Sequence, residues 1–309
     1  MSLRFHLKPE AVTWLGSAFD EKSIISPLYS VQAPGFAEQD KQGLMDQGII
    51  DTAGALTPTA YEFFNGLAGA QSFAGFRVAG PFGKIDKVAY FNGDRVYWVD
   101  NAGETLIVSD IKDTETILTI LNEITGISHL VNASLDIELD PAAAQVFTAL
   151  TDLTRQAALV ACAGKGMIPE GFSLDEILSA LNYEETRWFG SYLRRLRPDG
   201  VSVNPEIAAI ALQALIDAGY ISKNETGYSL VREAYAMAVN MLIIENVFHL
   251  RIGKVDNNEI QSGEALFLQA GLHDALMIDS DGKKIGFTSV STNAMIEYLI
   301  SMMTTPPKI

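Results

Sequence analysis

The residue types that most often carry chemistry are spread thinly along this sequence. The four histidines lie far apart, and none stands at close spacing with a cysteine or a carboxylate, as a metal site would require; they are His6, His129, His249 and His273. The sequence also lacks a nucleophile-elbow motif and a phosphate-binding loop. A Ser-His-Asp set assembled from distant residues stays open, but the sequence predicts no catalytic residue, no metal site and no cofactor.

Three carboxylates alternate in the segment SLDIELDP, at Asp136, Glu138 and Asp140. Alternate residues of a strand point to the same side, so this trio could face a divalent cation. The reading that we favour is an exposed strand edge that runs into a helix, with Asp140 as the cap and Pro141 as the first helical residue.

One dense basic cluster stands out in a chain with 22 basic and 38 acidic residues. Its members are Arg187, Arg194, Arg195 and Arg197. The cluster could meet a phosphate or an acidic partner, and these arginines are candidate partner-binding residues. A structural role is favoured, because Glu184 and Glu185 lie close in sequence and because cations late in a helix complement its dipole.

A large apolar residue, Phe82, stands between Pro81 and Gly83 in the segment AGPFGKID. The segment reads as a loop between two strands. An apolar side chain at the tip of such a loop is typical of a partner contact, although it could equally fold back onto its own sheet. Phe82 is therefore the second candidate partner-binding site.

The elements that would position these residues follow a pattern that occurs twice. The motif L-x-D-x-G-x-I spans residues 44–50 and again 215–221. Its glycines, Gly48 and Gly219, are predicted to end helices in the left-handed conformation, with the next residue packing back on the leucine of the motif.

The residues after each motif predict a second helix, capped by Thr57 in the first copy and by Ser229 in the second. Hairpins follow at residues 96–108 and 275–287, with a glycine in each turn, and a helix follows each hairpin. Before each hairpin the alternation of apolar residues predicts one more strand, in which Arg77 and Arg251 face outward.

These elements predict an α+β fold that is internally duplicated. Each half combines a winged-helix-like helical element with an antiparallel β-sheet. Residues 1–126 form the first repeat with an N-terminal helix, residues 127–202 a helical connector, and residues 203–309 the second repeat.

Composition narrows the class of function. The formal charge is −16, which repels phosphate backbones and anionic lipid, so nucleic acid and membrane partners are disfavoured. The most apolar stretch, residues 234–244, is shorter than the roughly 20 residues of a membrane helix. A single cysteine, Cys162, fits the cytoplasm better than an oxidising compartment.

The two L-x-D-x-G-x-I units, the hairpins VYWVDNAGETLIV and ALMIDSDGKKIGF, and the helix after each together cover nearly the whole chain. In this arrangement the sequence resembles the EspG-type cytosolic chaperones of type VII secretion. The resemblance implies a non-enzymatic protein that holds a helical export substrate in the cytosol and shields its apolar tip. It carries over no binding residue.

The sequence therefore predicts a non-enzymatic protein-binding adaptor or chaperone. The first alternative is a winged-helix nucleic-acid-binding regulator, which charge argues against, since the two helices that would enter a groove share one basic residue, Arg232. The second alternative is an enzyme or small-ligand-binding protein that uses a cleft between the halves.

Overall fold

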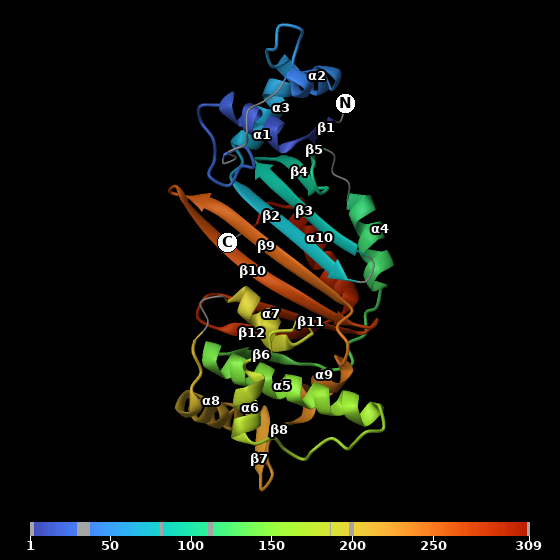
Figure 1. The fold of residues 1–309 in the computed structure, drawn as a ribbon, viewed down its shortest axis with the longest axis vertical. Helices are drawn as coiled ribbons and strands as arrows, with labels where there is room; N and C mark the ends of the chain where they lie inside the picture. Colours follow the sequence, from blue (N-terminus) through green and yellow to red (C-terminus); the bar gives the residue numbers. More distant parts are fainter. Residues whose placement is uncertain are drawn as a thin grey trace.

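The chain is built on one large antiparallel sheet, described here from a computed structural model that covers residues 3–29, 38–80, 83–110, 114–185, 187–197 and 201–307 (Figure 1). From one edge to the other its ten strands are β1 (Arg4–Leu7), β5 (Leu106–Ser109), β4 (Arg95–Asn101), β3 (Gly83–Asn92), β2 (Ser72–Gly80), β9 (Asn246–Asp256), β10 (Glu259–Ala270), β11 (Asp274–Ser280), β12 (Ile285–Val290) and β6 (Asp136–Leu139). A separate two-stranded hairpin joins β7 (Ile221–Asn224) to β8 (Gly227–Leu230).

The strand order has two corresponding halves that meet at the pairing of β2 with β9. From there the chain runs outward through β3, β4 and β5 on one side and through β10, β11 and β12 on the other. An earlier strand, β1 or β6, closes each edge. The helices and the large antiparallel sheet confirm the α+β class, whereas internal duplication and the division into two repeats and a connector stay predictions.

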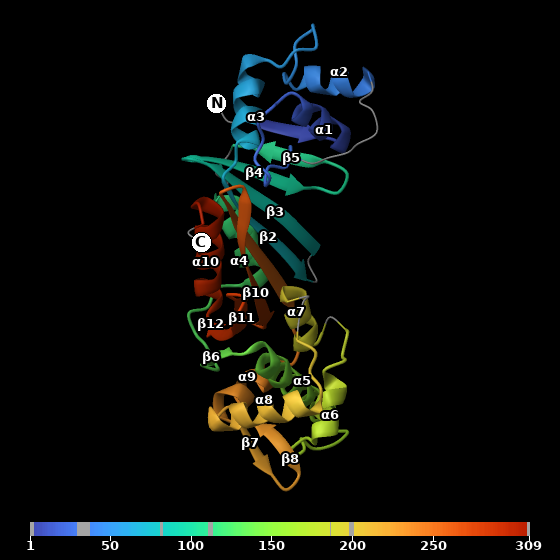
Figure 2. The ribbon, with the colours of Figure 1, turned by 90° about the vertical axis from the view of Figure 1, so that its left-hand side faces the viewer.

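Helices gather at both ends of the sheet and behind its middle (Figures 1 and 2). The β1 end carries α1 (Pro9–Ser17), α2 (Glu38–Asp46) and α3 (Pro58–Ala68); the middle is backed by α4 (Thr114–Thr125) and α10 (Thr292–Thr304). The β6 end carries α5 (Pro141–Cys162), α6 (Leu174–Ala180), α7 (Phe189–Leu196), α8 (Pro205–Asp217) and α9 (Arg232–Asn240). Within the helical connector predicted over residues 127–202, residues 173–196 contain two separate helices, α6 and α7.

Both predicted helix endings are confirmed. Gly48 has φ +68° and Gly219 has φ +77°, the left-handed region that glycine enters without steric cost. The amide of Ile49 donates to the carbonyl of Leu44 at 2.9 Å, and the amide of Tyr220 donates to that of Leu215 at 3.0 Å. These bonds satisfy carbonyls that the helix leaves free at its last turn.

The predicted caps have mixed outcomes. Thr57 caps α3, with its hydroxyl accepting from the amide of Ala60 at 3.3 Å. The prediction for Ser229 is wrong, because strand pairing continues through Leu230 and keeps Ser229 inside β8. Asp140 stands at the N-cap of α5, but its carboxylate pairs with Lys284 at 2.8 Å and makes no capping bond.

Alternation along β2 divides the two faces of the central sheet. Ala74, Phe76 and Val78 are buried in the core beneath α4 and α10. Phe73 and Arg77 point to the opposite face, which is covered near β1 by the core of α1 and α3 and near β6 by the core of α5 and α7. Between these two covered ends, no helix of the described residues lies over the middle of that face (Figures 1 and 2).

Candidate functional site

The uncovered middle of the sheet contains a hollow of about 340 Å³, which we call the open-face groove. It crosses the centre of the sheet, with walls from β3, β2, β9 and β10 and from the loop after α1. The lining residues are Ile25, Phe73, Gly75, Phe76, Arg77, Asp86, Val88, Tyr90, His249, Arg251 and Ile260. Six of these eleven residues belong to β2 and β9, the two strands that join the halves of the sheet.

Glycine shapes the apolar part of the groove. Gly75 pairs with Val88 on one neighbouring strand and with Arg251 on the other, and its missing side chain leaves a shallow space beside Val88, whose Cγ2 would lie 3.4 Å from an added Cβ. Phe73 lies opposite Gly253, where an added Cβ would strike the phenylalanine ring. The ring of Phe73 also approaches that of Tyr90, with 6.3 Å between centroids. The groove is therefore deepened at Gly75, next to the aromatic rings of Phe73 and Tyr90.

Two ion pairs make the polar part. Arg77 donates from Nε and Nη2 to Asp86 Oδ2 at 3.1 and 2.6 Å. Arg251 forms an ion pair with Glu264, with 2.8 Å between Nε and Oε1, and His249 Nε2 lies 3.1 Å from Glu264 Oε2. Because both arginines are on the uncovered side of the sheet, the outward orientation predicted by strand alternation is observed.

The hydroxyl of Tyr90 adds a neutral polar group. Burial, together with the negative charge of Asp86, raises the pKa of Tyr90 to about 12. The phenol is therefore protonated at neutral pH, and the groove presents no tyrosinate.

The four arginines of the predicted basic cluster do not converge on one site. Arg187 pairs with Glu185 at 2.6 Å and lies over the Trp188 ring, 4.8 Å from its centroid. Arg195 lies over the Tyr192 ring, 5.7 Å from its centroid. Each of these two therefore has a partner within its own helix or the turn before it.

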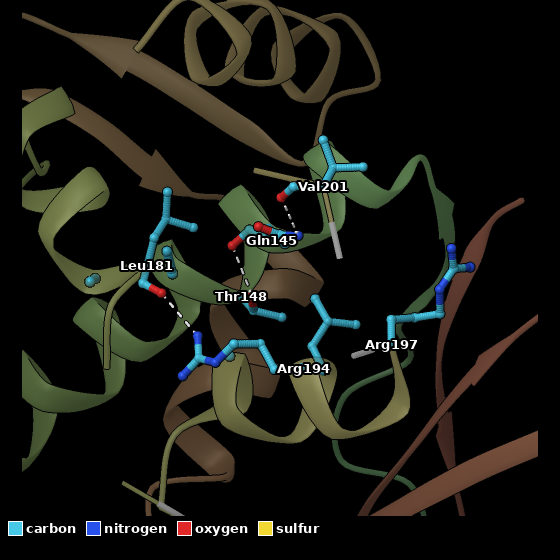
Figure 3. A pocket seen from close by; sticks show the side chains of 10 residues that line it. Gln145, Thr148, Leu181, Arg194, Arg197 and Val201 are labelled. Carbon is cyan, nitrogen blue, oxygen red and sulfur yellow. Dashed lines mark hydrogen bonds between the residues drawn. The ribbon is translucent and has the colours of Figure 1, made fainter. Parts of the chain in front are cut away.

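The other two arginines line a small pocket of about 170 Å³ beside α7 (Figure 3). Arg194 donates to the carbonyl oxygens of Leu181, at 2.9 Å, and of Tyr183. Arg197 donates to the carbonyl of Gly282, at 2.8 Å, in the turn between β11 and β12. These three bonds tie α7 to neighbouring segments, and a role of these arginines in partner binding stays a prediction.

The remaining sequence candidates are far from the groove or outside the description. Phe82 lies outside the described residues. Asp136, Glu138 and Asp140 are exposed on the edge strand β6 and its end, as the favoured reading expected. Within the described ranges, no group of three or more histidine, cysteine, aspartate or glutamate residues could hold a metal ion.

Sequence reasoning missed a buried ion pair on α5, at its contact with α7. Asp152 and Arg155 are almost completely buried and meet at 2.9 Å. Asp152 accepts from the amides of Phe189 and Gly190 at the start of α7, at 2.9 and 3.0 Å. Burial raises the pKa of Asp152 to about 6, against the opposing effect of Arg155.

Arg155 also donates hydrogen bonds to three carbonyl oxygens, those of Met241 at 2.7 Å, Arg187 at 2.9 Å and Leu242 at 3.1 Å. Its guanidinium also lies over the Phe189 ring, 4.7 Å from the centroid. Every charge here faces the protein interior, so the pair joins α5, α7 and the end of α9 and offers nothing to a ligand.

No protein-family model matches the chain, and no curated protein sequence does. Among solved structures it is similar to the Mycobacterium tuberculosis type VII secretion system chaperone EspG5, determined in complex with the PE25-PPE41 dimer. That match has a TM-score of 0.47 and 9% identity and covers 98% of this chain and 97% of that chain. The resemblance to EspG-type chaperones thus appears in structure as a weak similarity.

Proposed function

We propose that this protein is a non-enzymatic adaptor that binds a protein partner in the open-face groove. The observation that carries the proposal is the groove itself, an uncovered part of a sheet whose other face and both ends are covered by helices. The groove sits on paired strands at the centre of the sheet, so it is held rigidly and needs little ordering on binding.

The chemistry of the groove suits a protein surface. Phe73, Val88 and Ile260 give it an apolar wall, and Ile260 is 48% exposed. Charged side chains stand directly beside this wall. An apolar centre with aromatic groups and arginine at its border is typical of protein–protein interfaces.

Charge supports a protein partner over nucleic acid. The chain carries a formal charge of −16, which opposes a polyanion along its whole length. No helix in the described part of the chain is long and apolar enough to cross a membrane. We extend the proposal, from the sequence resemblance, to a cytosolic chaperone that holds a helical export substrate and shields its apolar tip.

The proposal is tested with one pair of matched variants. Ile260→Asp places a charge in the wall of the groove, and Ile210→Asp places the same charge on α8, where the isoleucine is 71% exposed. Tagged wild-type protein and both variants are purified from the native cell at moderate salt, and co-purifying proteins are quantified by mass spectrometry. Circular dichroism verifies that both variants fold.

We expect a stoichiometric protein with the wild type and with Ile210→Asp, and its loss with Ile260→Asp. A partner retained by Ile260→Asp would place binding outside the groove. Recovery of nucleic acid or of a small metabolite in place of a protein would overturn the adaptor function.

A further inference from the structure

The polar part of the open-face groove exposes hydrogen-bond donors and hides acceptors. In the pair of Arg77 with Asp86 the arginine side chain is 53% exposed and the carboxylate side chain 17%. In the pair of Arg251 with Glu264 the corresponding values are 59% and 27%. A molecule entering the groove therefore meets guanidinium groups first, although the chain as a whole is strongly acidic.

The two guanidinium groups stand close enough to act together. Arg77 is opposite His249 in the β2–β9 pairing, and Arg251 is two residues further along β9 on the same face. Such diagonal neighbours have Cα atoms about 7–8 Å apart, within reach of long side chains. Both arginines belong to the wall of one hollow, and Gly75 is adjacent to both, opposite Arg251 and two residues from Arg77 along β2.

Each arginine keeps donors that its carboxylate does not use. Arg77 donates from Nε and Nη2 to Asp86, and Arg251 faces Glu264 with Nε in an ion pair. Within the described ranges, no hydrogen bond is seen to Nη1 of Arg77 or to either Nη atom of Arg251. The guanidinium fork matches the two oxygens of a carboxylate, and such charge-assisted bonds are about twice as strong as neutral ones.

We propose that Arg77 and Arg251 bind a carboxylate of the partner, the side chain of an aspartate or glutamate that lies next to a large apolar residue. This rests on the proposed function, and it specifies the partner segment: the apolar residue occupies the hollow above Gly75, and the acidic residue is held by the two arginines. The site is thus selective for acidic-apolar sequence.

The overall negative charge does not oppose this local recognition. At physiological salt, charges further away than about 8 Å are largely screened, so an acidic side chain inside the groove responds mainly to the nearest guanidinium groups. A polyanion such as nucleic acid extends far beyond the groove and meets the acidic surface around it. A single carboxylate on a peptide therefore fits better than a phosphate backbone.

The test selects peptides from a random library displayed on phage, with the immobilised full-length chain as target. Selection is repeated on the double variant Arg77→Gln/Arg251→Gln and on the control Arg95→Gln, which changes an exposed arginine paired with Glu62 on the surface. Enriched peptides are then synthesised with their acidic residue present or replaced by its amide, and their dissociation constants are measured by calorimetry.

We expect enriched peptides to carry an aspartate or glutamate beside a large apolar residue, and their binding to survive Arg95→Gln. Replacement of the acidic residue, or of both arginines, should weaken binding about tenfold or more, the effect of losing one charge-assisted bond. An excess of inorganic phosphate should compete weakly, and a DNA oligonucleotide should not compete.

Three results would overturn the proposal. If the enriched peptides lacked an acidic residue and bound the double variant normally, carboxylate recognition would be disproved, while the groove would remain a protein-binding site. Competition by DNA at micromolar concentration would assign the arginines to nucleic acid. If Ile260→Asp left binding of every enriched peptide unchanged, or if selection enriched none, the groove itself would fail as the docking site.

Discussion

Two regions of this molecule use the same chemical pairing in opposite ways. In the helices at the β6 end, Asp152 and Arg155 are almost completely removed from solvent, and every donor and acceptor is directed at the chain itself. On the open face of the sheet, Arg77 and Arg251 also pair with carboxylates, but more than half of each arginine side chain is exposed.

The difference lies in desolvation. Removing two charges from water costs several kcal/mol per ion, so a buried pair is tolerated only when its geometry and its additional hydrogen bonds are good, and loss of one member leaves the other uncompensated. An exposed pair retains water, contributes little to stability and can exchange its solvent for a ligand. Burial therefore separates charges that hold the fold from charges that are available for recognition.

Replacement of Arg155 should have the largest effect. Arg155→Met leaves the Asp152 carboxylate buried without its cation and three carbonyl oxygens without their donor. We expect a loss of about 3–5 kcal/mol in the free energy of unfolding, measured in urea. The matched change on the open face, Arg251→Met, should cost less than about 1 kcal/mol. Equal losses in the two variants would remove the distinction between the regions.

The pH dependence of stability gives an intermediate effect. The pKa of Asp152 is about 6 in the native protein and near its ordinary value of 3.8 when the chain is unfolded, so folding takes up a proton between these pH values. The resulting stabilisation is complete below pH 3.8 and is lost as the pH rises through 6. Between pH 5 and pH 7 this amounts to about 1 kcal/mol.

The measurement compares urea unfolding of the wild type with that of Asp152→Asn at both pH values. The difference between the two proteins should change by about 1 kcal/mol over this interval, because only the wild type carries the titrating carboxyl. Asp281→Asn is the control: hydrogen bonds from the backbone lower the pKa of the exposed Asp281, so that variant should keep the wild-type slope. A slope in Asp152→Asn equal to that of the wild type would show that Asp152 does not titrate in this range.

The parts of the fold that were predicted from sequence depend on local signals. A glycine after an amphipathic helix, as at Gly48 and Gly219, encodes its own conformation within a few residues, and so does a threonine followed by proline at Thr57. The predicted helix cap at Ser229 is wrong because serine also fits a strand. Pairing with Ser222 across the hairpin decides in favour of the strand.

The candidate site could not be predicted in the same way. Its two central strands are separated by more than 160 residues in sequence, and only their register brings Arg77 beside His249 and Gly75 beside Arg251. Asp152 and Arg155 looked like an ordinary helical i, i+3 pair, because their burial depends on the packing of α7 and α9. Alternation did predict that Arg77 and Arg251 point outward, but not that they share one hollow.

The smallest effect is expected from a double-mutant cycle on Arg251 and Glu264, with Arg251→Met and Glu264→Gln alone and together. The coupling energy should be about 0.2–1 kcal/mol, as for other exposed pairs, and should fall in 1 M salt, where the screening length is about 3 Å. The same cycle on Asp152 and Arg155 should give a larger coupling that salt barely changes, because no ions reach that pair. A salt-independent coupling above about 2 kcal/mol on the open face would mean that Glu264 holds Arg251 as firmly as Asp152 holds Arg155. Arg251 would then be a structural residue, and of the two arginines Arg77 alone would be available to a ligand.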